Sequence, residues 1–441
     1  MRWAPHTDDD VQEMLAASGL ATLDDLYAHL PAGVVLDRDL DIPAGLSEME
    51  LLAEVRRLAA RTRHADDLVC FAGGGAYDHY VPAVVWALTG RSEIYTSYTP
   101  YQPELSQGIL QALFEYQSLM CELTGLEVSN ASLYDGATAL VEAVHMAVSA
   151  TKRQRVLVSD ALDRRYVETL RTSAAGEGFE LEVLAAAGGR TTVPGAGAVE
   201  GAAAVVVQHP NYFGNLEPAR ELFAEASAAG ARAIHVFDPL ALGVLASPGE
   251  LGADIAVGEG QVLGNHLSYG GPYLGIIAAK MQDVRRMPGR IAGETTDVDG
   301  KTGYVLTLQA REQHIRRAKA TSNICTNQTL MAYAATVYLA WLGPEGLAEL
   351  GRQCLAKTRY AAQSLTDLAG ISLRTPGAEF FKEFVVQTTT RPAAEVQRGL
   401  IDAGFLVGPV LGDDGLLISV TERRTREEID RFVKAFAEAA T

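Results

Sequence analysis

Four short runs of mostly apolar, β-branched residues between about residues 130 and 260 constrain the fold more than any other feature. They occupy residues 155–159, 203–208, 233–237 and 254–257, and helical stretches separate them. Short apolar strands that alternate with helices are typical of a parallel sheet covered on both faces. We therefore predict an α/β sheet domain.

Helical and mixed segments flank this sheet domain. Acidic caps precede apolar residues within 1–65, which predicts a helical N-terminal arm. Residues 346–441 combine helical patterns with strands expected at 384–387 and 416–420, which predicts a smaller α+β domain. The large α/β domain then spans 66–345.

Proline and glycine mark the ends of several further elements. Tyrosines crowd residues 95–101, where prolines exclude a continuous helix, and Pro103 suits the first turn of a helix that ends at Gly125. A buried apolar helix is expected at 328–342. Turn residues within 287–303 predict an exposed excursion.

The charge balance and the cysteines exclude several classes of protein. The 55 acidic and 37 basic residues give a net charge of −18, which disfavours nucleic-acid binding. The longest apolar stretch, 330–342, is too short to span a membrane, and the N-terminus lacks the pattern of a secretory signal. No CxxC pair is present, so we predict a reduced, cytoplasmic protein without a metal site. The four cysteines are Cys70, Cys121, Cys325 and Cys354.

Two positions beside the predicted strands suit a ligand. Small residues at Gly136, Ala137 and Thr138 open a helix, where backbone N–H groups and the helix dipole attract a phosphate or carboxylate. An ordinary cap made by Asp135 explains this segment too, and from the segment alone that reading is favoured. Asp238 follows a strand, at the sheet edge where ligands usually bind, although a buried structural aspartate is the alternative.

A glycine-rich stretch at 258–272 requires unusual backbone angles or a close approach to another group. Its polar residues include Glu259, Gln261 and His266, and a lone histidine in such a loop is more often a hydrogen-bonding residue than a metal ligand. The HExxH, GxSxG and P-loop patterns are absent from the sequence. Metalloprotease, serine hydrolase and nucleotide phosphatase activities are therefore unsupported.

Four long motifs, in this order along the chain, resemble one family closely. The sequence resembles the glycine decarboxylase family, the P-protein of the glycine cleavage system, and specifically subunit 1, the N-terminal-half subunit of its two-gene form. The resemblance covers nearly the whole chain, beginning at Trp3-Ala-Pro-His-Thr7. The motifs are Phe71-Ala-Gly-Gly-Gly-Ala-Tyr-Asp-His-Tyr80, Tyr95-Thr-Ser-Tyr-Thr-Pro-Tyr-Gln-Pro-Glu104, Asn130-Ala-Ser-Leu-Tyr-Asp-Gly-Ala-Thr138 and Thr321-Ser-Asn-Ile-Cys-Thr-Asn-Gln328.

The resemblance implies an aspartate-aminotransferase-like fold of the type I pyridoxal-phosphate (PLP) enzymes. It also implies a role in glycine dehydrogenase (decarboxylating), which releases CO₂ from glycine and transfers the aminomethyl group to the lipoyl arm of the H-protein. The expected partners are a PLP-bearing sister subunit, subunit 2, in a two-plus-two heterotetramer, and the H-protein. PLP chemistry needs a Schiff-base lysine.

The resemblance places Gln261 where the sister subunit carries that lysine, and a glutamine amide cannot form an imine. Lys280, the nearest lysine downstream, is expected on the surface. Asp238 matches the aspartate that pairs with the PLP ring nitrogen, and the helix turn described above matches the phosphate cup. The resemblance thus implies a degenerate pocket here and PLP on the partner. This pocket comprises Gly136, Ala137, Thr138, Asp238 and Gln261.

A contribution to catalysis is expected instead from the loop that precedes the helix at Pro103. Phenol hydroxyls and an amide on a rigid helix start could complete a partner's active site across an interface, although simple subunit packing explains the aromatic residues equally well. No catalytic residue is assigned to this chain. The candidates for an interface or substrate tunnel are Tyr95, Tyr98, Tyr101, Gln102 and Glu104.

A basic cluster at 311–319 stands out in so acidic a chain. A salt-bridged helix face is the favoured interpretation, and steering of the glycine carboxylate or the lipoyl partner is the alternative. Two other functions remain open for the whole chain: a structural pseudoenzyme that stabilises its partner, and an autonomous PLP-dependent lyase or transaminase. The cluster contains Arg311, His314, Arg316, Arg317 and Lys319.

Overall fold

The computed structural model describes residues 5–31 and 33–441. Trp3 and Ala4 of the opening motif lie outside the described residues. Contacts divide the chain into two compact units, Met1–Arg63 and His64–Thr441, and we describe each unit by itself. A further division of the second unit near residue 345 remains a prediction.

The first unit contains two capped helices, α1 (Asp8–Ala17) and α2 (Glu48–Ala59). Thr7 begins α1 with a capping box, as the acidic cap predicts, and Ser47 begins α2 with a capping box that was not predicted. The pattern after Thr22 forms only one 3₁₀ turn, Asp24–Tyr27. All apolar side chains of α2 are exposed. The large apolar side chains exposed on this unit are Met14, Leu23, Leu26, Tyr27, Leu30, Val34, Val35, Leu36, Leu40, Ile42, Leu46, Met49, Leu51, Leu52, Val55 and Leu58.

A seven-stranded sheet forms the centre of the second unit. Five neighbouring strands, from β9 to the edge strand β4, are parallel, and β10 and β2 complete the sheet at its other edge in antiparallel pairing. All four predicted strands of this region are present, so the predicted α/β fold class is confirmed. In spatial order the strands are β2 (Val128–Ser129), β10 (Gly275–Ala279), β9 (Ile255–Glu259), β8 (Arg232–Phe237), β7 (Ala202–His209), β3 (Arg155–Ser159) and β4 (Glu180–Leu184).

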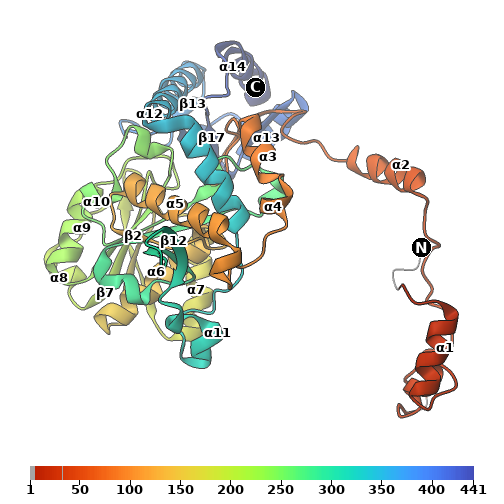
Figure 1. Cartoon of the computed structure of the whole chain (residues 1–441). Helices are drawn as coiled ribbons and strands as arrows, with labels where there is room; N and C mark the ends of the chain where they lie inside the picture. Colours follow the sequence, from red (N-terminus) through yellow and green to blue (C-terminus); the bar gives the residue numbers. More distant parts are fainter. Residues whose placement is uncertain (1–4, 32) are drawn as a thin grey trace. The chain divides into compact units, whose positions relative to one another are not determined.

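Helices cover both faces of this sheet, as Figure 1 shows. Alternate residues of β3 and β7 face opposite ways: Val156 and Val206 pack in the cluster under α6, whereas Leu157 and Val205 pack under α9. Burial on both faces explains why the strands are apolar throughout. The surrounding helices are α3 (Ala83–Thr89), α4 (Ser92–Tyr95), α5 (Gln107–Thr124), α6 (Gly136–Thr151), α7 (Arg164–Glu177), α8 (Ala196–Val199), α9 (Ala219–Ala228), α10 (Pro248–Leu251) and α11 (Gln313–Arg316).

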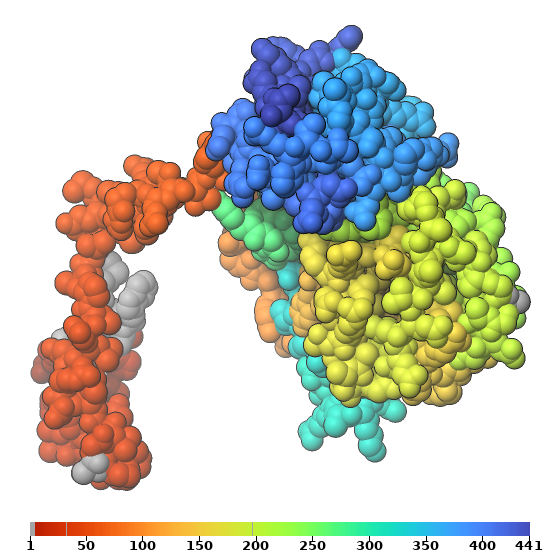
Figure 2. All heavy atoms as spheres, turned by 180° about the vertical axis from the view of Figure 1, so that it is seen from behind, coloured from red at the N-terminus to blue at the C-terminus, as the bar shows by residue number. Residues whose placement is uncertain are grey.

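The C-terminal part of this unit has its own antiparallel sheet. In Figure 2 this part, coloured blue, lies against the rest of the unit. Both strands predicted here are present. Unexpectedly, β1 (Val69–Ala72) pairs in parallel with β15 (Phe405–Gly408), and Phe71 stacks on Phe432 at 4.1 Å. The remaining elements are β13 (Ile371–Leu373), β14 (Glu383–Thr388), β17 (Gly415–Ser419), β16 (Val410–Leu411), α13 (Ala393–Asp402) and α14 (Arg426–Ala440).

Three predicted elements need correction. Pro103 begins a separate 3₁₀ turn, and α5 starts only at Gln107. The apolar helix does not end at Gly343, because α12 (Thr329–Thr366) continues beyond a kink where Gly343 has φ 64°. The predicted excursion is mostly a hairpin, β11 (Ile291–Thr296) and β12 (Thr302–Thr307), which packs on α5. A further short pair is β5 (Ala186–Ala187) with β6 (Arg190–Thr191). None of the helices in the described ranges could cross a membrane.

A buried glutamate on α6 predicts stability that depends on pH. Burial raises the pKa of Glu142 to about 7, although the Ser322 hydroxyl donates a hydrogen bond to it. The raised pKa makes the folded state retain a proton, so this contribution is complete below about pH 4.5 and is lost as the pH rises through 7. Glu142→Gln should therefore unfold like the parent at about pH 5 and be more stable, by up to roughly 3 kcal/mol, at about pH 8.

Urea unfolding at both pH values measures this difference. Glu122→Gln, which replaces an exposed glutamate, is the control and should shift both measurements equally. The same Glu142→Gln effect at both pH values would contradict the prediction.

Candidate functional site

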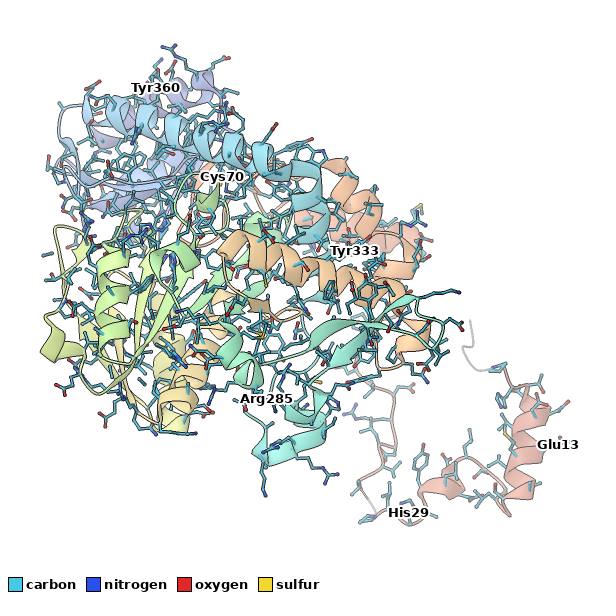
Figure 3. The ribbon with its side chains drawn as sticks, turned by 60° about the vertical axis from the view of Figure 1, so that its left-hand side comes forward. Glu13, His29, Cys70, Arg285, Tyr333 and Tyr360 are labelled. Carbon is cyan, nitrogen blue, oxygen red and sulfur yellow. The ribbon has the colours of Figure 1, made fainter. Side chains whose placement is uncertain are left out.

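A cavity of about 140 Å³ brings together three of the sequence motifs. The tyrosine loop at 95–101 forms one wall, and Ala131 and Ser132 precede α6 on another. Thr326 and Asn327, which lead into α12, close it, and the Ser132 hydroxyl donates a hydrogen bond to the Asn327 side chain. Figure 3 shows Tyr333, another lining residue, where α12 passes α5. We call this the tyrosine cavity.

The tyrosine loop presents phenol groups to solvent at the mouth of this cavity. Tyr95 and Tyr98 line it and are 66% and 71% exposed, and the Tyr98 hydroxyl lies 3.2 Å from the Thr326 hydroxyl. Tyr101 lies beside the cavity, where its hydroxyl accepts a hydrogen bond of 3.2 Å from Arg290. Gln102 and Glu104 are exposed and do not line the cavity. The structure therefore brings together three of the five tunnel candidates.

Arg290, at the start of the β11–β12 hairpin, provides a positive charge in the wall of the cavity. It is 6% exposed, its guanidinium lies 5.5 Å from the centre of the Tyr101 ring, and it donates to the carbonyl oxygen of Cys325 at 3.1 Å. Its Nε also lies 4.0 Å from the buried carboxylate of Glu312, so the positive charge is already partly compensated. A guanidinium fixed by these groups presents preorganised hydrogen-bond donors. The sequence reading missed Arg290 because it assigned the residue to an exposed excursion.

The basic cluster does not form a salt-bridged helix face. Its residues occupy three single turns, and Arg311 is partly buried, with its guanidinium donating to the carbonyl oxygen of Met287. Within residues 5–31 and 33–441, no ion pair involves Arg316, Arg317 or Lys319, and these side chains are exposed. The favoured interpretation was therefore wrong.

Two other residues of the sequence analysis lie outside any cavity described here. Lys280 is 41% exposed and pairs with Asp254 at 2.7 Å, as expected for a surface lysine. His266 stacks on Trp86 with ring centres 5.3 Å apart. Neither residue contacts the two sites described in this subsection.

The residues of the expected degenerate pocket do converge, at the carboxyl edge of the main sheet. Asp238 follows β8 and Glu259 ends β9, and these strands are neighbours with Phe237 opposite Gly258. Parallel strands place such residues at one edge, beside the start of α6. The degenerate pocket implied by the resemblance remains a prediction, and of its five residues Asp238 lines the small space at this edge.

A carboxylate of the chain itself occupies the start of α6. Glu259 accepts hydrogen bonds from the backbone N–H groups of Gly136 (3.0 Å), Gln261 (2.9 Å) and Leu274 (3.0 Å). Burial raises the pKa of Glu259 to about 7, while these three donors stabilise its charged form. The Thr138 N–H bonds to Asp135, which confirms the ordinary cap.

A lysine of the chain itself forms an ion pair with Asp238. Lys382, next to β14, places its ammonium 2.7 Å from the Asp238 carboxylate and 3.6 Å from the centre of the Tyr77 ring. The same ammonium lies 3.2 Å from Nε2 of His79. Burial and this positive charge lower the pKa of His79. Asp238 therefore has a cationic partner already.

Gln261 is held by hydrogen bonds rather than facing an open space. Its amide oxygen accepts from the Tyr77 N–H at 2.9 Å, and its amide nitrogen donates to the carbonyl oxygens of Tyr77 (3.1 Å) and Asn265 (2.7 Å). The Tyr77 hydroxyl donates in turn to Glu383 at 2.8 Å. Burial raises the pKa of Glu383 to about 7. The glutamine thus fixes the segment that carries Tyr77.

These residues do not fit pyridoxal phosphate. The space left at this edge is about 50 Å³, whereas ordinary ligand pockets measure roughly 300–1,000 Å³. Glu259 already accepts the hydrogen bond from the Gly136 N–H that a phosphate would need. Lys382 already pairs with the Asp238 carboxylate that a ring nitrogen would need. No reaction step is therefore assigned to this pocket.

The tight fit around Gly136 predicts a loss of stability on enlarging it. A Cβ here would overlap the Tyr166 hydroxyl and lie 3.1 Å from the Glu259 nitrogen. Gly136→Ala is expected to lower the free energy of unfolding by about 1–3 kcal/mol in urea. Adding Tyr166→Phe should recover part of this loss.

Gly176→Ala is the matched control, because Gly176 lies in α7 with nothing within 4 Å of its added Cβ. It should leave stability unchanged or raise it by up to about 1 kcal/mol. A Gly136→Ala protein as stable as the parent would mean that the start of α6 is looser than described here.

Lys382 was missed by the sequence reading, and Glu259 was noted without a role. The signal for both was present: Lys382 and Glu383 interrupt an apolar strand region, where charged residues are rarely buried unless they are paired. Glu259 ends a buried strand. Their partners, however, are distant in sequence, so the pairing itself could not be predicted.

Solved structures share the fold. A sphingosine-1-phosphate lyase of Burkholderia pseudomallei superposes with a TM-score of 0.67 at 14% identity, covering 91% of this chain and 92% of that one. An alanine–glyoxylate aminotransferase of Nostoc has a TM-score of 0.60 at 15% identity, covering 85% and 96%. The predicted fold, that of the type I PLP enzymes, is confirmed.

Closer relatives define the family. Subunit 1 of the probable glycine dehydrogenase (decarboxylating) of Moorella thermoacetica is 52% identical over 99% of both chains. The crystal structure of a glycine decarboxylase (P-protein) of the glycine cleavage system in inhibitor-bound form has a TM-score of 0.93 at 46% identity, covering both chains completely. The model of the glycine cleavage system P-protein matches residues 1–436. The chain therefore belongs to the glycine cleavage system P-protein family.

Proposed function

We propose that this chain is the cofactor-free subunit of a two-subunit glycine dehydrogenase (decarboxylating). With its PLP-bearing partner it decarboxylates glycine, releases CO₂ and passes the aminomethyl group to the lipoyl arm of the H-protein. The observation that carries this proposal is that Gln261, which the resemblance places where the sister subunit carries its imine-forming lysine, is a hydrogen-bonded amide, beside a space too small for the cofactor. The relatives' designation as subunit 1 supports it.

In this proposal the chain acts through the tyrosine cavity. The exposed hydroxyls of Tyr95, Tyr98 and Tyr101 lie beside a fixed guanidinium, which suits a small zwitterion or the carboxylate of glycine. Such groups can orient a substrate and exclude water from an active site completed by the partner. Gln102 and Glu104 are proposed to contact the partner, because they are exposed beside this mouth.

The proposed assembly contains two copies each of this chain and its sister subunit, and it acts in the cytoplasm with the H-protein. The apolar side chains of the first unit support a subunit interface, because they are exposed in the isolated chain. So many exposed large apolar side chains in one short unit are typical of an interface rather than of a free surface.

Borohydride trapping tests the proposal directly. The purified chain, its partner and their mixture are each incubated with PLP, reduced and mapped by peptide, and glycine-dependent CO₂ release is measured in parallel. We expect a reduced adduct on the partner alone and CO₂ release only in the mixture. A stoichiometric adduct on a lysine of this chain would instead favour an autonomous PLP enzyme.

The second candidate function is a pure scaffold for the partner. The observation that favours it is the closed pocket, in which the chain's own side chains satisfy every ligand-binding group named above. It differs from the first proposal in giving the tyrosine cavity no part in turnover, and the tyrosine variants discussed below separate the two.

A further inference from the structure

Two charged side chains of the degenerate pocket lie at the two positions where the resemblance implies the phosphate and the ring nitrogen of a pyridine phosphate. Glu259 lies at the start of α6, and Lys382 lies at Asp238. One is an anion with oxygen acceptors, and the other is a cation with hydrogen-bond donors. Their signs and positions correspond to the phosphate and the protonated ring nitrogen, respectively.

The Glu259 carboxylate, at the anionic end of the pocket, accepts the kind of hydrogen bonds that a phosphate would accept. A phosphate at a helix start binds backbone N–H groups and the positive end of the helix dipole. Glu259 receives the N–H of Gly136, the first residue of the 16-residue helix α6, together with two further backbone N–H groups. Tyr166 packs against the same glycine, so no room remains for a second anion while the Glu259 side chain is in place.

At the cationic end of the pocket, the Asp238 carboxylate is paired with an ammonium that comes from another part of the chain. Lys382 is 2% exposed and reaches Asp238 from the segment before β14. Its ammonium also lies over the face of Tyr77, in a cation–π contact of 3.6 Å. A buried ammonium needs such compensation on all sides, and these contacts supply it.

We propose that the chain supplies both charges of a pyridine phosphate from its own side chains: the Glu259 carboxylate replaces the phosphate, and the Lys382 ammonium replaces the ring nitrogen. The pocket is thereby closed without a ligand. Loss of the Schiff-base lysine at position 261 is then only one of three changes that exclude the cofactor. This inference goes beyond the proposed function, because it concerns a pocket that the reaction does not use.

Inorganic phosphate tests the anionic end. Removing the carboxylate with Glu259→Ser vacates the α6 start, and phosphate should then raise the melting temperature of the variant by at least about 2 °C relative to chloride at equal ionic strength. The parent should show no such response. Glu259→Gln should also show none, because the amide fills the same space.

Glu142→Ser is the matched control, since it removes another buried glutamate of α6 away from the helix start. The proposal would be overturned if phosphate raised the melting temperature of the parent, of Glu259→Gln or of Glu142→Ser as much as that of Glu259→Ser. It would also be overturned if phosphate left the melting temperature of Glu259→Ser unchanged. If Glu259→Ser does not fold, refolding yield in phosphate against chloride gives the same decision: higher yield in phosphate supports the proposal, and equal yield contradicts it.

The cationic end is tested with pyridoxamine phosphate, which needs no lysine for binding. The double variant Glu259→Ser/Lys382→Met should bind it at least about tenfold more tightly than Glu259→Ser, because Asp238 becomes free for the ring nitrogen. Equal affinity in the two variants would remove Lys382 from the proposal. These readouts need no turnover, so a chain inactive in glycine decarboxylation could still give the expected result.

Discussion

Lys382→Met is expected to lower the free energy of unfolding by about 3–5 kcal/mol, because a buried ion pair loses one partner. The variant leaves the Asp238 carboxylate with the Leu240 N–H, at 3.0 Å, as its remaining hydrogen-bond donor among the described residues. The His79 ring, 3.2 Å from the same ammonium, loses that partner too. Urea unfolding of the purified chain measures the change.

Two further variants make this result specific. Lys382→Met/Asp238→Asn removes both charges and should recover most of the loss, since a neutral pair needs no compensation. Lys280→Met is the control: its ammonium also lies 2.7 Å from a carboxylate, that of Asp254, but it is 41% exposed. This control should cost no more than about 1 kcal/mol. A similar loss for both lysines would show that burial is not the cause.

Replacing Tyr95, Tyr98 and Tyr101 together by phenylalanine is expected to lower glycine-dependent CO₂ release of the two-subunit mixture by about 100-fold or more. The change removes three hydroxyls and keeps the rings, so packing and assembly should persist. Arg290 loses the Tyr101 hydroxyl, and Thr326 loses the Tyr98 hydroxyl. Size-exclusion chromatography of the mixture verifies assembly before turnover is measured.

Tyr360→Phe is the matched control for this experiment. Figure 3 shows Tyr360 on the same helix as Tyr333 but far along it, where its hydroxyl donates to Asp430. The control should leave turnover unchanged. If the triple variant assembles and also turns over normally, the scaffold function becomes the better account of this chain.

The strands were predictable because their signal is local. Residues 155–159 have three apolar residues between an arginine and a serine, and the structure gives β3 the same bounds. The hairpin β11–β12 escaped prediction because its two strands are half exposed and separated by turn residues, so they carry little hydrophobic signal. Tertiary packing on α5, rather than composition, makes this segment regular.

The candidate site was only half predictable, for a related reason. Asp238 and the turn at Gly136 follow from the rule that parallel strands present ligands at their carboxyl edge. Lys382 is 144 residues downstream of Asp238 in the printed numbering, and no pattern links the two. Long-range ion pairs depend on how separate sheets dock, which a single sequence does not encode locally. The place of Arg290 in the wall of the tyrosine cavity could not be predicted from the sequence for the same reason.

The parallel pairing of β1 with β15 has a consequence for synthesis on the ribosome. β1 lies near the start of the second unit, whereas β15 and the stacking partner Phe432 are synthesised much later. Phe71 is fully buried in the folded protein. During synthesis its side chain therefore lacks these packing partners until β15 and Phe432 have been made. Contacts this distant in sequence fold slowly and invite misassembly, so we expect nascent chains of this protein to depend on chaperones.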